Sequence, residues 1–366
     1  MSGLGVMASP EGARIDFARL RTTRRERLLE AMDGAAIDVL ILGRPADVLY
    51  ASGARQLWTA GARPFGPACI VVRTTERVHL LSTWDEGVPA ELNHDDLFGL
   101  SWNPAVIAAN LATIDGLAAA RTIGTDSFSP GFGHLIDVVA PGATVVDAGP
   151  ALVTARSVKT ADEVAAIATA TAIAESALQA LIGALRPGVT ERELVGVYLE
   201  RIALLGTPTP PSEGVVCITP PATRRTLPSD RAVAAGDLVV LNPGALYAGY
   251  EGGVGRTVSV GEPSAAAMTL ASRGELSRLI DQCRPGPWGG GELYGLGIGM
   301  EPPVVPPMAG AMLQEGMVVA VQSWVADADV GGFFEREVVQ VTSGEPEVLG
   351  RATRGLTAAA TGSSVR

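Results

Sequence analysis

Lysine, histidine and net positive charge are scarce in this chain of 366 residues. Lys159 is the only lysine among 28 basic residues, and 39 acidic residues bring the formal net charge to −11. A protein that binds the phosphate backbone of nucleic acids needs a clustered basic surface. We therefore expect no nucleic-acid partner.

Cysteines are few, and long apolar runs are missing. Cys69, Cys217 and Cys283 lie far apart, which excludes a cysteine metal knuckle and predicts free buried thiols in a reducing compartment. No stretch of about 20 apolar residues runs without a charge or a proline. Residues 1–16 have neither the basic nor the apolar region of a signal peptide. We expect a cytoplasmic protein without a membrane partner.

All three histidines lie in the first part of the chain, at His79, His94 and His134. The remainder therefore has no imidazole for metal binding or for proton transfer near neutral pH. Cys217 could act as a nucleophile only if another domain supplied the histidine that activates it.

Apolar residues are plentiful, at 47 % of the chain, and this length usually divides into about two domains. Short apolar runs at 38–43, 68–72 and 78–82 alternate with helical stretches, which predicts an α/β domain over 17–153.

The pattern changes after this domain. Capping boxes at 160–163 and 190–193 predict two helices, and strands with glycine turns follow. One further helix is predicted over 264–283. We expect an α+β domain over 154–350. The residues at 351–366 are small and polar, so we expect a disordered tail there.

Several motifs resemble one known family. LNPGA at 241–245, YAGYEGGVGRT at 247–257 and GLGIG at 295–299 resemble the C-terminal domain of the creatinase and Xaa-Pro aminopeptidase family, which includes prolidase and methionine aminopeptidase. DVLYASG at 47–53 is similar to a segment of the N-terminal domain of creatinase and prolidase. The resemblance implies a pita-bread fold for the second domain.

The resemblance does not extend to the metal ligands. Active members hold two metal ions with two aspartates, one histidine and two glutamates, and a metal-bound hydroxide attacks the amide carbonyl. Four carboxylates are lost and one guanidinium is gained, which leaves no anionic ligands for a hard divalent cation. We expect no metal and no cofactor. The corresponding positions hold Asn242, Gly253, Leu296, Gln322 and Arg336.

Creatinase works without metal, and the resemblance implies that its proton-transferring histidine corresponds to Arg225, beside Arg224. Arginine does not exchange protons near neutral pH, so we do not expect creatine as a substrate.

The resemblance places several arginine, amide and tyrosine side chains in the former metal cavity. Such groups favour a planar anion, because arginine pairs with carboxylates through two parallel hydrogen bonds. The alternative is that Arg225 and Arg336 face solvent or form ordinary ion pairs. The expected substrate-binding residues are Arg225, Asn242, Tyr250, Arg256, Gln322 and Arg336.

Glu251 is the first candidate for proton transfer, because strand alternation puts it on the same side as Gly253. It could instead be a turn residue in a glycine-rich bend. Tyr247 and Glu337 are further catalytic candidates, although Tyr247 could simply pack. Alternation leaves it open whether Arg336 or its neighbouring glutamates face the cavity.

The resemblance also implies a homodimer in which Trp58 and Arg63 of the first domain reach the partner's pocket. We expect metal-independent hydrolysis or elimination at a C–N bond of a small anionic or amino-acid-derived molecule, in specialised metabolism or natural-product biosynthesis. The alternative is an inactive pseudopeptidase that binds a ligand or partner. An intact Xaa-Pro peptidase with substituted ligands is disfavoured.

Overall fold

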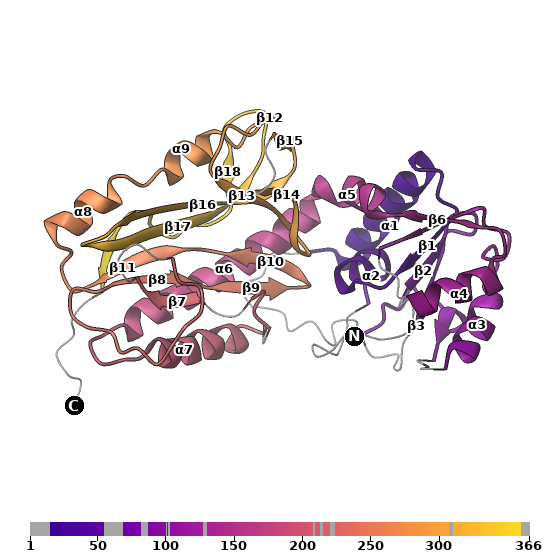
Figure 1. The fold of residues 1–366 in the computed structure, drawn as a ribbon, viewed down its shortest axis with the longest axis horizontal. Helices are drawn as coiled ribbons and strands as arrows, with labels where there is room; N and C mark the ends of the chain where they lie inside the picture. The colour runs from indigo at the N-terminus through magenta and orange to yellow at the C-terminus, as the bar shows by residue number, and fades with distance from the viewer. Residues whose placement is uncertain are drawn as a thin grey trace. The chain divides into compact units, whose positions relative to one another are not determined.

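The computed structural model describes residues 15–54, 69–81, 87–99, 101, 103–126, 130–207, 209–212, 215–219, 224–306 and 310–359. They form two compact units, an N-terminal unit from Asp16 to Arg156 and a C-terminal unit from Ser157 onward (Figure 1). The expected boundary between 153 and 154 falls inside helix α5 (Gly149–Ser157).

The N-terminal unit is a six-stranded mixed sheet with the strand order β4-β3-β2-β1-β5-β6. β1 pairs in parallel with β5 and antiparallel with β2, and all four residues of its VLIL run are buried. The strands are β1 (Val39–Leu42), β2 (Cys69–Val72), β3 (Arg77–Leu81), β4 (Leu97–Phe98), β5 (Thr122–Thr125) and β6 (Thr144–Asp147).

Helices accompany this sheet in the alternating order that the sequence predicts (Figure 1). The carboxylate of Asp126, just after β5, accepts the backbone N–H groups of Gly43 and Arg44 at 2.8 Å, which ties the ends of two parallel strands together. The helices are α1 (Phe17–Gly34), α2 (Pro45–Ser52), the 3₁₀ helix η1 (His94–Asp96), α3 (Pro104–Ala112), α4 (Pro130–Val139) and α5.

The C-terminal unit begins with two helices, α6 (Ala161–Ala184) and α7 (Glu191–Leu204), and both start with the capping boxes that the sequence predicts. α6 is long and apolar enough to cross a membrane by length and composition alone. In this unit it packs against α7 and the strands β9 (Gly244–Tyr247) and β10 (Tyr250–Gly253), which is the environment of a core helix. Gly252 permits the contact, because an added Cβ would clash with the backbone nitrogen of Thr171.

Strands make up the rest of the unit. A four-stranded sheet has the order β19-β11-β8-β7, and a five-stranded sheet has the order β14-β13-β16-β17-β18. The bridge between Gly255 and Arg336 joins the two sheets. The strands are β7 (Val215–Ile218), β8 (Leu238–Asn242), β11 (Arg256–Val260), β12 (Gly286–Pro287), β13 (Glu292–Gly297), β14 (Gly299–Val305), β15 (Met312–Leu313), β16 (Val318–Asp327), β17 (Gly331–Gln340), β18 (Glu347–Val348) and β19 (Thr357–Ala359).

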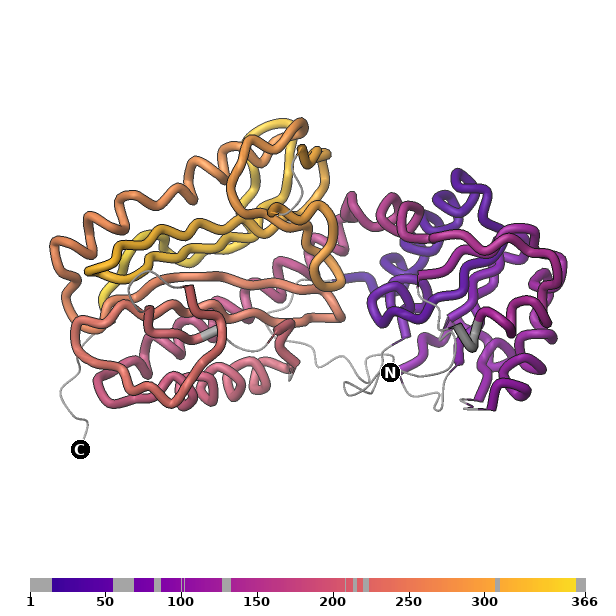
Figure 2. Tube along the Cα trace, viewed as in Figure 1, coloured from indigo at the N-terminus to yellow at the C-terminus, as the bar shows by residue number. Residues whose placement is uncertain are grey.

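Two short helices, α8 (Ala265–Ala271) and α9 (Leu276–Asp281), follow β11 where the sequence predicts one helix over 264–283. They lie along the outer face of β16 and β17 (Figures 1 and 2). Gly274 lies in the break, and a Cβ there would come within 2.9 Å of the Phe333 ring. The opposite face of β16 and β17, which we call the inner face, carries Arg336 and contacts β10.

The prediction of a disordered tail at 351–366 is wrong for residues 351–359. β19 pairs in parallel with β11, and Ala359 is 2 % exposed. The carbonyl groups of Ala352 and Thr353 accept hydrogen bonds from Arg256 at 2.8 and 2.7 Å, which holds the segment before β19. Residues 360–366 lie outside the described part of the chain.

Candidate functional site

Arg336 of β17 crosses the inner face of the unit to reach β10. A Cβ built on Gly255 would lie 2.8 Å from its Cβ, and a Cβ built on Gly253 would lie 3.0 Å from its Nη1. Its Nη2 donates to Oε1 of Glu251 at 3.0 Å. The absence of side chains at Gly253 and Gly255 leaves a groove in which the Arg336 side chain lies, and we call this groove the Gly255–Gly253 track. The resulting ion pair is buried, with Arg336 5 % and Glu251 8 % exposed.

Tyr294 of β13 completes this contact. Its hydroxyl lies 3.5 Å from Oε1 of Glu251, and the Cζ of Arg336 lies 5.2 Å from the centre of its ring. Burial raises the pKa of Tyr294 to about 12, against the opposing effect of Arg336 and Arg224. The phenol is thus a proton donor throughout the physiological range.

A row of polar residues continues from Arg336 across the sheet. Gln322 of β16 is opposite Arg336, and Glu292 of β13 is opposite Gln322, so the three side chains share one face. Arg224 lies over this row, with Nη1 2.7 Å from Oε2 of Glu292 and Nη2 3.2 Å from Oε1 of Gln322. These two hydrogen bonds hold its guanidinium over the inner face.

The formal charges of the site balance. Arg224 and Arg336 contribute two positive charges, and Glu251 and Glu292 contribute two negative charges. The sequence predicts a cavity that favours anions, because the arginines are visible in it but their carboxylate partners are not. With each guanidinium paired to a carboxylate, these four groups present alternating charges whose formal sum is zero.

Arg225, predicted to bind substrate, is held in an ion pair elsewhere. Its two terminal nitrogens donate to the carboxylate of Glu191 at 2.7 and 2.9 Å. Glu191 is fully buried and also accepts from the backbone nitrogens of Ile218 and Ser229. For Arg225 the alternative stated above, an ordinary ion pair in place of a substrate-binding role, therefore holds. The pair anchors Arg225 to the start of α7.

Arg256 and Glu337 also lie outside the site. Arg256 is 2 % exposed and binds backbone carbonyls with Nε, Nη1 and Nη2, and it forms an ion pair with Glu337. Because Glu337 is next to Arg336 in the strand, its side chain leaves the opposite face, and burial raises its pKa. The structure thus places Arg336 in the site, with Glu335 and Glu337 facing away from it.

The predicted tyrosines and amides divide between the site and the core. The Tyr250 hydroxyl donates to Oε1 of Glu163 on α6 at 2.9 Å, on the face of β10 opposite Glu251. Tyr247 is 4 % exposed on β9, and burial raises its pKa. Asn242 ends β8, and its Oδ1 is buried without a hydrogen-bond partner among the described residues. Trp58 and Arg63 lie outside the described residues.

Sequence reasoning missed four residues in or beside this site. Arg224 is named there only as the neighbour of Arg225, and Glu292, Tyr294 and Trp324, whose ring centre lies 5.9 Å from the Cζ of Arg224, are not singled out. Strand alternation is a signal for both aromatics, because Tyr294 is two positions after Glu292 and Trp324 is two positions after Gln322.

Comparisons with known proteins agree with this architecture. The creatinase/prolidase N-terminal domain model matches residues 24–158, and the metallopeptidase family M24 model matches residues 165–294. The Xaa-Pro dipeptidase of Pyrococcus furiosus is 24 % identical over 373 residues, which cover 91 % of this chain and 99 % of that protein. The Xaa-Pro dipeptidase of Pyrococcus horikoshii is 22 % identical over 362 residues, which cover 90 % and 97 %.

Solved structures show the same fold. The prolidase from Pyrococcus horikoshii superposes with a TM-score of 0.73 at 20 % identity and covers 90 % of this chain and 99 % of that one. The Xaa-Pro dipeptidase from Bacillus anthracis gives 0.75 at 19 % identity, with 92 % and 99 % covered. The chain belongs to the creatinase/prolidase family. The expected α/β N-terminal domain and pita-bread C-terminal domain are confirmed.

The residues present do not fit the two metal ions of active members of this family. At the five positions that the resemblance assigns to ligands, Asn242, Gly253, Leu296, Gln322 and Arg336 offer no carboxylate and no imidazole. The guanidinium of Arg336 lies where a side chain at position 253 would project. Within the described ranges, no group of three histidine, cysteine, aspartate or glutamate residues could hold a metal ion.

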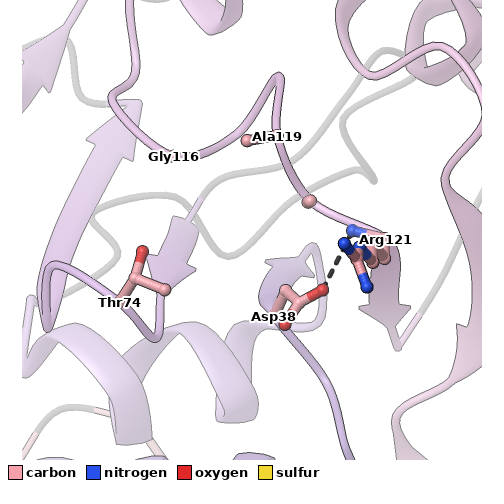
Figure 3. Close-up of a pocket in the computed structure, with 6 residues that line it drawn as sticks. Asp38, Thr74, Gly116, Ala119 and Arg121 are labelled. Atoms are coloured by element: carbon pink, nitrogen blue, oxygen red, sulfur yellow. Dashed lines mark hydrogen bonds between the residues drawn. The ribbon is translucent and has the colours of Figure 1, made fainter.

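The N-terminal unit of this creatinase/prolidase-family chain has a shallow pocket of about 260 Å³ at the amino ends of β1 and β5 (Figure 3). The carboxylate of Asp38 accepts from Arg73 and from the backbone nitrogens of Arg121 and Thr122. These contacts lower its pKa and occupy both of its oxygens. None of the predicted site residues lines this pocket; its lining is Asp38, Thr74, Gly116, Ala119, Ala120 and Arg121.

Proposed function

We propose that the pita-bread domain of this chain binds a small amino-acid-derived molecule and does so without a resident divalent metal ion. One observation carries the metal independence: Arg336 lies in the Gly255–Gly253 track and pairs with Glu251. A Cβ added at Gly253 would lie 3.0 Å from Nη1 of Arg336, so the guanidinium occupies the space into which a metal-binding carboxylate at that position would project. A divalent cation placed there would be repelled by the guanidinium by several kcal/mol.

The balance of charges supports the ligand class. Arg336 keeps Nε and Nη1 free of hydrogen bonds to the described residues, so it can still donate to a carboxylate. The buried Oδ1 of Asn242 lacks a donor among those residues, and a protonated amine would supply one. A ligand with an amine and a carboxylate fits an alternating site better than a simple anion does. The relatives named Xaa-Pro dipeptidase point to the same class.

A second candidate is turnover without metal, by hydrolysis or elimination at a C–N bond. The contact between Glu251 and the Tyr294 hydroxyl favours it, because a carboxylate beside a protonated phenol is a candidate base with a candidate acid. If the protein is an enzyme of this kind, its role in specialised metabolism stays a prediction. A homodimer and a cytoplasmic location likewise stay predictions.

Metal analysis combined with thermal shift tests the proposal. We expect purified protein to contain less than stoichiometric manganese, cobalt or zinc. We also expect L-alanyl-L-proline or free L-amino acids to raise its melting temperature equally with and without EDTA. A ligand at 100 times its dissociation constant stabilises by about 2.7 kcal/mol, which is well within reach of the assay. Stoichiometric metal with EDTA-sensitive cleavage of L-alanyl-L-proline would contradict the proposal.

Matched variants separate the two candidates. Arg336→Gln removes the guanidinium of the site, whereas Arg278→Gln removes an exposed one from the surface of α9. We expect only the first to abolish the ligand-induced shift. Glu251→Gln tests turnover: if Glu251 is the base, this variant lowers kcat by about 10²- to 10⁴-fold, whereas a binding protein shows no turnover with either residue.

A further inference from the structure

Four side chains form what we call the stacking cluster: Arg224, Tyr294, Trp324 and Phe334. Trp324 of β16 is opposite Phe334 of β17, one step along the same face from the Gln322–Arg336 pair. Tyr294 comes from β13 on the other side of β16. The cluster therefore adjoins the polar row of the site on the inner face of this sheet.

Trp324 is held in place but not covered. Its ring lies directly against the backbone of β17, because an added Cβ at Gly332 would clash with the indole. Phe334 is only 2 % exposed, whereas Trp324 and Tyr294 are both partly exposed. Part of the indole of Trp324 is therefore accessible to a ligand beside the polar row.

Arg224 adds a fixed planar cation to these rings. Its Cζ lies 4.9 Å from the centre of the Phe334 ring and 5.9 Å from that of Trp324. The hydrogen bonds to Glu292 and Gln322 fix the guanidinium before any ligand arrives. Arg336 repeats the arrangement over Tyr294, held by Glu251. The inner face thus presents pre-positioned arginine–aromatic pairs beside the charged groups that bind the ligand.

Planar arginine and indole surfaces attract flat π-systems more than saturated groups of the same size. We propose that this site selects ligands with an aromatic ring, which stacks on Trp324 and Arg224 while the amine and carboxylate occupy the polar row. The substrate class is thereby an aromatic amino acid or its small derivative. This inference rests on the proposed function and deepens it.

The test compares ligands that differ only in planarity. Calorimetry would measure the dissociation constants of L-phenylalanine and L-phenylalanyl-L-proline against their cyclohexylalanine counterparts, which have the same carbon skeleton without the π-system. We expect the aromatic member of at least one pair to bind about tenfold more tightly to the full-length protein.

Variants assign the preference to the cluster. Trp324→Leu should remove the tenfold preference while the cyclohexyl ligand keeps its affinity, and Trp324→Phe should restore most of it. Arg224→Lys keeps the charge opposite Glu292 but loses the planar group, so it should weaken the aromatic ligands selectively. Arg278→Gln, on the exposed surface, is the control, and melting temperatures check that each variant is folded.

The outcomes are distinguishable. Equal affinities within both pairs, or a preference that survives in Trp324→Leu, would overturn the inference and leave the proposed function standing. No binding of any amino-acid ligand would overturn both. If 3-phenylpropionate, which lacks the amine, binds as tightly as L-phenylalanine and with the same dependence on Trp324, the stacking inference holds and the amino-acid class of the proposed function fails.

Discussion

A double-mutant cycle on Arg336 and Glu251 tests whether these two buried charges compensate each other in the core. The cycle replaces each residue alone and then both together. Both residues are nearly buried, with Arg336 5 % and Glu251 8 % exposed, and their charged atoms are 3.0 Å apart. Arg336→Met leaves a buried carboxylate, and Glu251→Met leaves a buried guanidinium. Breaking a buried pair in this way costs about 3–5 kcal/mol. Arg336→Met also loses the contact with Tyr294, worth about 1 kcal/mol.

The double variant should recover most of this loss. Two well-packed apolar side chains in place of a buried ion pair are often neutral or stabilising, so we expect it to unfold within about 2 kcal/mol of the parent protein. The coupling energy of the double-mutant cycle would then be about 3 kcal/mol or more. Urea unfolding gives the free energies. Hydrogen exchange of β10 and β17 assigns them to the C-terminal unit, since a chain of two units need not unfold in one step.

Two results would refute the reasoning. Single variants that each cost less than about 1 kcal/mol would show that neither charge needs the other. Additive costs without coupling would show that the two side chains are not partners in solution.

Three further outcomes follow from other buried groups. Lys159→Met should cost about 3–5 kcal/mol in urea unfolding because it removes the ammonium group that neutralises the buried carboxylate of Glu301, and adding Glu301→Met should recover most of this loss. Burial raises the pKa of Glu191, but its hydrogen bonds, led by those from Arg225, outweigh this effect and lower the pKa below the ordinary value of 4.5. The ionised carboxylate therefore stabilises the fold fully at pH values above 4.5, and this stabilisation is lost as the pH falls through the lowered pKa. Glu191→Gln should flatten the acid limb of a melting-temperature curve; an unchanged limb would contradict this. Gly252→Ala should cost about 1–3 kcal/mol by pushing β10 off α6, and an unchanged melting temperature would contradict the close contact.

Local signals in the sequence predicted much of the fold. The capping boxes before α6 and α7 and the apolar runs of the N-terminal sheet depend on neighbours within a few residues, and such patterns can be read directly. Alternation likewise predicted that Glu251 and Gly253 share a face, and the structure shows both beside Arg336.

What the sequence could not show depends on partners far along the chain. Arg225 pairs with Glu191, 34 residues earlier, and Arg256 pairs with Glu337, 81 residues later. No local pattern announces either pair. The tail was expected to be disordered from its small polar residues, but pairing with β11, about a hundred residues away in sequence, orders it as far as Ala359.

The choice between Arg336 and its neighbours shows the same limit. Alternation restricted the answer to two possibilities, and only the glycine track on the facing strand decides between them. Gly253 and Gly255 accommodate a guanidinium that the facing strand would otherwise exclude. Complementarity of this kind between two strands is a property of the assembled core, not of either segment.

A crystal of the protein soaked in manganese chloride, with anomalous diffraction recorded above the manganese edge, shows whether the site between β10 and β17 takes up a divalent metal ion. We expect no anomalous peak there and a guanidinium in density beside Gly253. A variant with five substitutions serves as the positive control, because it restores the ligand types that the resemblance assigns to these positions. The substitutions are Asn242→Asp, Gly253→Asp, Leu296→His, Gln322→Glu and Arg336→Glu. Two manganese peaks at that place in the unaltered protein would contradict this expectation.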